Sequence, residues 1–210
     1  MGGGSSRLTE YQRQQRQRDS RMMASSRSIK DEGNEWLIAF DRDGTEMFRN
    51  TDNKHGEVSF GSDENWRRGV DHITVHNHPE KNAFSGADVN VAFFVEESWV
   101  STSERVMKFK WNENYFTPNF NSTRQQLRSR AEEFAKKVDE MHDKVWPKAR
   151  EEYDKKHPMP EYGKVSYEQM TAHLKARAEG VRLLAQQKQR NWFKNNQKKY
   201  GYTYSERTWK

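Results

Sequence analysis

The spacing of the hydrophobic residues changes near residue 121, and this change limits the folds that the chain can adopt. Between residues 35 and 120, short apolar runs alternate with turn residues, which is typical of strands joined by tight connections. Beyond residue 121, apolar residues recur at spacings of four and three, which places them on one face of a helix. This stripe consists of Leu127, Ala131, Phe134, Val138, Met141 and Val145. The chain is therefore predicted to combine an α/β domain with a helical part.

The first part of the chain contains short elements typical of a small α/β domain, which we place at residues 31–118. Its strands are rich in β-branched and aromatic residues, and its helices begin at capping residues, namely Ser62 or Asp63 and then Ser85. The predicted elements are a hairpin over 35–50, a strand over 56–60, a helix over 62–70, a strand over 72–78, a helix that begins at Ser85, and two strands that meet at 101–104.

The second part, residues 119–210, is predicted to be a helical hairpin with a basic, aromatic tail. The first helix is expected to end near Lys155, with a kink or an early stop at Pro147, and the second to begin at Ser166. The apolar stripe of each helix must be covered, so we expect the two helices to pack together, and we consider a homodimer through the hairpin. The aromatic residues of the tail either stack on single-stranded nucleic acid or, as we favour, pack back onto a domain.

The N-terminal segment, residues 1–30, is basic and poor in large aliphatic residues, and it carries most of the chain's net charge of +6. Such a segment buries little apolar surface to offset its ordering entropy, so we expect a flexible arm or a marginal helix over residues 9–23. Arm and tail together are a candidate surface for nucleic acid. No apolar run approaches the ~20 residues of a membrane helix, so we expect a cytoplasmic protein without membrane contact.

Two histidines and an aspartate near the end of a predicted strand have the spacing of metal ligands. The chain has no cysteine, so a metal ion must be held by His, Asp or Glu. His76 and His78 are two apart on the strand and point the same way, and Asp88 lies in the first turn of the next helix. Two nitrogens and one oxygen leave a fourth position open, as in catalytic zinc sites. Ser85 lies on the intervening loop, and Pro79 stiffens the exit of the strand.

The motif H-x-H-P followed by S-x-x-D resembles the zinc motif of the JAMM metalloproteases of the MPN domain superfamily, which includes deubiquitinating isopeptidases, and of the related bacterial RadC-like proteins. The resemblance implies a three-layer, cytidine-deaminase-like α/β domain with a mixed sheet. It implies a Zn²⁺ ion held by His76, His78 and Asp88, with water as the fourth ligand. It also implies that Ser85 polarises or holds the oxygen of the scissile carbonyl.

The same resemblance implies a glutamate that acts as general base at the start of an early strand. Glu35, directly before the apolar run 36–40, is the matching position, and Glu32 is the alternative. The implied activity is hydrolysis of a peptide or isopeptide bond by a metal-activated water, with a protein or a ubiquitin-like conjugate as substrate. Similar domains occur in proteins of phages and mobile elements, which suggests such an origin for this chain.

Three other interpretations stay open. In the first, the chain is a catalytically inactive MPN-like scaffold that binds nucleic acid or a protein assembly. In the second, it holds zinc for stability alone. The third interpretation is a His-Asn-His nuclease, because these letters occur at residues 76–78. A nuclease of that kind needs a ββα metal unit with further histidines downstream, and the next histidine, His142, lies within the predicted helical hairpin.

Overall fold

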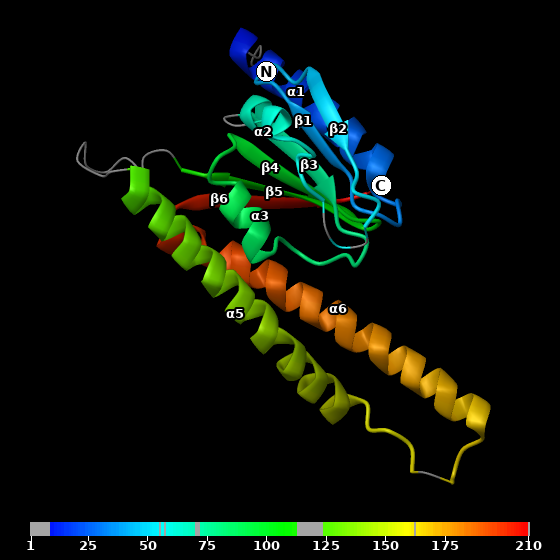
Figure 1. The fold of residues 1–210 in the computed structure, drawn as a ribbon. Coiled ribbons are helices and arrows are strands. Elements are labelled where there is room, and N and C mark those ends of the chain that lie inside the picture. Colours follow the sequence, from blue (N-terminus) through cyan, green and yellow to red (C-terminus); the bar gives the residue numbers. More distant parts are fainter. Residues whose placement is uncertain are drawn as a thin grey trace, which may run out of the picture. The chain divides into compact units, whose positions relative to one another are not determined.

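The computed structural model describes residues 9–54, 56, 58–69, 72–112, 124–161 and 163–209 (Figure 1). The contacts within the chain divide it into two units, which we describe separately. The first unit contains residues 1–81, 92–111 and 205–210, and the second contains residues 82–91 and 112–204. Among the described residues, no helix combines the length and the apolar character needed to cross a membrane.

Six strands form one mixed sheet, in the order β2-β1-β3-β4-β5-β6. Strands β3 and β4 are parallel, whereas β1 is antiparallel to both β2 and β3, and β4 is antiparallel to β5. Strands β1, β3 and β4 are buried at every position; β1 is a continuous apolar run, whereas β3 and β4 also bury polar side chains. The α/β class is confirmed. The strands are β1 (Leu37–Phe40), β2 (Glu46–Asn50), β3 (Ile73–Asn77), β4 (Glu97–Ser101), β5 (Arg105–Trp111) and β6 (Tyr202–Thr208).

Helix α1 (Glu10–Ile29) packs against β3 and β4 in the first unit. The sequence predicts a flexible arm or a marginal helix over this segment. The structure shows instead a longer helix with a buried side, so residues 10–29 are not a flexible arm. The helix starts with a capping box between Thr9 and Gln12. Its buried side is narrow, with Met22 fully buried and Ile29 3% exposed. A single stripe of this kind is compatible with a very polar composition, which is why composition misled the prediction.

The segment between β2 and β3 differs from the sequence prediction in one element. Residues 56–60 are predicted to form a strand, but the described residues 58–60 are irregular. Asn50 and Asp52 bind this segment through side chains, since Asp52 accepts from the Ser59 N–H at 2.7 Å and Asn50 donates to the Ser59 carbonyl at 3.0 Å. Helix α2 (Asp63–Gly69) follows and is capped by Ser62, whose hydroxyl accepts from the Asn65 N–H at 3.1 Å.

The second unit contains two long antiparallel helices, α5 (Arg124–Lys156) and α6 (Tyr167–Tyr200), and the short helix α3 (Gly86–Val91), which packs against α5. The predicted hairpin is confirmed by ion pairs between its helices: Asp154 of α5 pairs with Arg177 of α6, and Glu152 of α5 pairs with Lys188 of α6. Pro147 lies inside α5 and does not end it. The predicted stripe is buried from Ala131 to Val145, while the side chain of Leu127 lies outside the described residues.

The C-terminal residues form regular structure rather than an extended tail. Helix α6 continues to Tyr200, and Gly201 ends it in the left-handed region with φ of 72° before β6 begins. Phe193 is fully buried and Tyr202 is 1% exposed, and the Tyr202 hydroxyl donates to the Phe193 carbonyl at 2.8 Å. Burial raises the pKa of Tyr202. Of the two sequence interpretations, packing against the protein is confirmed for these side chains.

Candidate metal centre

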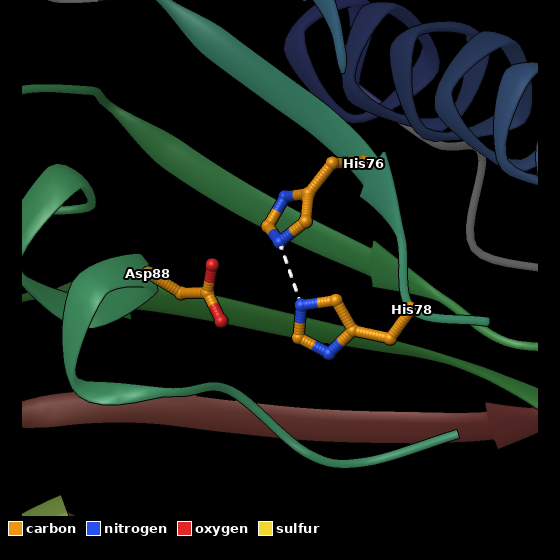
Figure 2. A group of neighbouring side chains, drawn as sticks. All are labelled: His76, His78 and Asp88. Atoms are coloured by element: carbon orange, nitrogen blue, oxygen red, sulfur yellow. Dashed lines mark hydrogen bonds between the residues drawn. The ribbon is translucent and has the colours of Figure 1, made fainter. Parts of the chain in front are cut away.

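The two histidines of the motif lie at the end of β3 and face each other. His76 is the penultimate residue of the strand, and the His78 N–H extends the ladder by donating to the Ser101 carbonyl of β4 at 2.8 Å. The two side chains leave the same face of the strand because they are two residues apart. Their Nε2 atoms are 3.1 Å apart, and the residues are only 6% and 8% exposed (Figure 2).

The distance between the two nitrogens has a chemical consequence. At 3.1 Å one Nε2 must donate and the other must accept, because two lone pairs at this separation repel. The proton between them lies on one Nε2, and a cation that binds both nitrogens requires that this ring carry its proton on Nδ1 instead. In a tetrahedral zinc site with Zn–N bonds of about 2.0–2.1 Å, two nitrogens lie roughly 3.3 Å apart. The observed pair is already close to that spacing.

Asp88 is held by the cap of α3. Its Oδ2 accepts from the backbone N–H of Ser85 at 2.6 Å and from the Ser85 hydroxyl at 2.8 Å. In return, the Ser85 hydroxyl accepts from the Asp88 N–H at 3.2 Å, which is the reciprocal bonding of a capping box. The predicted start of a helix at Ser85 is thus confirmed. Because two donors fix one oxygen, the plane of the Asp88 carboxylate is set by Ser85, as is common for carboxylates that bind metals.

The three predicted ligands come together. His76, His78 and Asp88 each offer one ligand atom, and these atoms all lie within 4.8 Å of one another. Figure 2 shows the Asp88 carboxylate facing the two imidazole rings. Two imidazole nitrogens and one carboxylate oxygen suit Zn²⁺. Within the described part of the chain no other histidine joins this group, as a His-Asn-His nuclease would need.

The two glutamates considered as general base differ in burial. Glu35 is 8% exposed, whereas Glu32 is exposed to solvent. Leu37 pairs with His76 across β1 and β3, and the Asn77 N–H donates to the Trp36 carbonyl at 3.3 Å, which extends this ladder by one residue. Glu35 lies two residues before β1, and extending the alternation of the strand to it puts it on the same face as Leu37 and His76. Burial and register both favour Glu35 over Glu32.

Asn77 is a residue whose contribution sequence reasoning missed. It lies between the two histidines and points to the opposite face, where it is fully buried. Its Oδ1 accepts from the Trp36 N–H at 2.7 Å, and its Nδ2 donates to the carbonyls of Asn34 at 3.1 Å and Glu32 at 3.3 Å. The backbone on both sides of Glu35 is thereby tied to the strand that carries the histidines. A polar residue inside a buried strand was the available signal.

Comparisons with protein-family models, with curated proteins and with solved structures found no match. The function of the chain is therefore inferred from its own residues. The group of His76, His78 and Asp88 is chemically able to hold a divalent cation. Such an arrangement suits metal-assisted hydrolysis.

Proposed function

We propose that the chain is a metal-dependent hydrolase that cleaves an amide bond. Within that class, its residues favour a zinc enzyme of the JAMM type that acts on a peptide or isopeptide bond. The observation that carries the proposal is the convergence of His76, His78 and Asp88, whose ligand atoms lie within 4.8 Å of one another. The order of these residues along the chain and the position of Glu35 add to it.

Each residue has a defined part in the proposed reaction. Zinc bound to three protein ligands lowers the pKa of a coordinated water from about 15.7 to about 7. Glu35 accepts the proton of the attacking water on its carboxylate and then delivers it to the leaving amine nitrogen. His76 and His78 would hold the metal as neutral imidazoles through Nε2, so each ring would carry its proton on Nδ1. Ser85 orients Asp88 through its backbone N–H and its hydroxyl. We propose that the hydroxyl turns to donate to the substrate carbonyl, while the backbone N–H keeps Asp88 in place.

The test is the zinc content of the purified protein after reconstitution, measured by elemental analysis. We expect one zinc per chain in the wild type and a loss of most of it in His78→Ala and in Asp88→Ala. His173→Ala is a matched control, because His173 is exposed on α6 and outside the ligand group. Asp63→Ala is the matched control for Asp88, since Asp63 also lies in the first turn of a short helix.

Glu35→Gln separates catalysis from metal binding. Because Glu35 acts on water rather than on the metal, this variant should keep its zinc and lose turnover of quenched fluorescent peptides or of a ubiquitin-like isopeptide conjugate. Zinc in the wild type without any turnover, together with a lower melting temperature after chelation, would indicate a structural zinc site. A wild-type protein that takes up no zinc would refute the proposal and leave the inactive scaffold as the better explanation.

A further inference from the structure

The helical hairpin holds the loop that leads to Asp88. Three backbone groups of this loop are bound by side chains of α5 and α6, all within the second unit. Their partners are a glutamine, a histidine and an aspartate. The Ala83 N–H donates to Gln189 Oε1 at 3.3 Å, His142 Nε2 lies 2.9 Å from the Phe84 carbonyl, and the Gly86 N–H donates to Asp139 Oδ1 at 2.9 Å.

The direction of each hydrogen bond in this network is determined. The Phe84 carbonyl can only accept, so His142 carries its proton on Nε2. Gln189 Oε1 accepts from the Ala83 N–H, so the amide nitrogen of Gln189 is the donor toward His142 Nδ1, 3.0 Å away. The neutral imidazole of His142 then has the lone pair of its Nδ1 facing the amide hydrogen of Gln189. Gln189 is fully buried, and every polar atom of this chain of bonds has a compatible partner.

Gly86 shows that the contact with α5 is close. A Cβ atom at this position would lie 2.4 Å from both carboxylate oxygens of Asp139. Any larger residue would push the Asp139 carboxylate away from the Gly86 N–H. The ring of Phe84 is also fixed, because it is fully buried and packs edge-on against Phe193 of α6, with ring centroids 6.0 Å apart. The backbone from Ala83 to Gly86 thus has polar and apolar attachments to the hairpin.

We propose that Asp139, His142 and Gln189 are positioning residues for the metal ligand Asp88. They fix the backbone up to Gly86, next to Ser85, and the Ser85 cap then fixes the Asp88 carboxylate. The hairpin is in this view part of the metal site rather than an appended module. His142, which the sequence analysis places only within the predicted helical hairpin, has this role. The inference rests on the proposed zinc site.

The test measures the zinc dissociation constant by competition with a chelator. Residues that orient metal ligands typically contribute a factor of 10–100 to metal affinity, so we expect Gln189→Leu and Asp139→Ala to bind zinc roughly 10–100-fold more weakly than the wild type. Asp139 is exposed, so its variant should fold normally. Asp139→Asn keeps an oxygen that can accept from the Gly86 N–H, and it should retain most of the affinity.

The control variant is Arg177→Gln, which removes a pair between the same two helices, with Asp154, that does not touch the loop. It should leave the zinc affinity unchanged. Amide hydrogen exchange of the metal-free protein gives a second readout: the Ala83 amide should exchange faster in Gln189→Leu, and the Gly86 amide in Asp139→Ala. Normal zinc affinity in both loop variants would overturn the positioning role while leaving the proposed zinc site intact. A wild-type protein without zinc affinity would overturn both.

Discussion

Replacing Asn77 tests whether the segment around Glu35 is held as the structure indicates. Asn77→Ala removes three hydrogen bonds, from the Trp36 N–H and to the carbonyls of Asn34 and Glu32. A buried hydrogen bond contributes on the order of 1 kcal/mol, and the loss of a partner leaves backbone groups unsatisfied. The expected destabilisation is therefore about 3 kcal/mol. Urea unfolding of the metal-free protein, followed by tryptophan fluorescence and circular dichroism, measures it.

Asn65→Ala is the matched control for this measurement. Asn65 lies in α2, and its side chain makes one hydrogen bond, to the Phe60 carbonyl at 3.0 Å, so its loss should cost about 1 kcal/mol. Asn77→Asp should cost at least as much as Asn77→Ala, because the new carboxylate is a buried charge that faces the carbonyl oxygens of Asn34 and Glu32 without a donor between them. A cost for Asn77→Ala no larger than that of Asn65→Ala would refute the reasoning.

Three further predictions concern the helices. Met22→Ala should lower the free energy of unfolding by about 2–5 kcal/mol in urea titrations, because Met22 is fully buried, whereas a flexible arm would tolerate the change. Gly180→Ala should lower the melting temperature despite a helix-propensity gain of about 1 kcal/mol, since the new Cβ would lie 2.0 Å from the ring of Tyr153; in a Tyr153→Ala background the same change should stabilise. A hydrogen bond from Lys188 lowers the pKa of Glu152 below its usual 4.5, so this pair stabilises the hairpin above pH 4.5 and the contribution is lost as the pH falls through the lowered pKa. The difference in melting temperature between wild type and Lys188→Gln should therefore vanish in acid.

The sequence predicts those parts of the fold that depend on local patterns. The apolar spacing from Ala131 to Val145 identifies α5, and the reciprocal cap at Ser166 identifies the start of α6. The grouping of the three candidate ligands is predictable because strand alternation aligns His76 with His78 and a capping serine places the next helix after them. Each of these signals lies within a few residues along the chain.

Features that depend on distant partners are not predictable in this way. Helix α1 is stabilised by a narrow stripe and by Arg18, which pairs with the buried Glu97, 79 residues later. Likewise, nothing near His142 indicates that it binds the Phe84 carbonyl, 58 residues earlier. The proposed general base is an intermediate case: the sequence leaves Glu35 and Glu32 open, and the register of β1 against β3 favours Glu35.

The connection between β5 and β6 makes the helical hairpin an insertion between two neighbouring strands. These strands are adjacent in the sheet, and the Asn112 N–H donates to the Gly201 carbonyl at 2.9 Å. The two ends of the inserted segment therefore meet, so a tight turn could replace residues 113–200 without removing a strand. The six-stranded sheet and the helical hairpin can therefore be separated by a single deletion, because the order of the strands does not depend on the inserted helices.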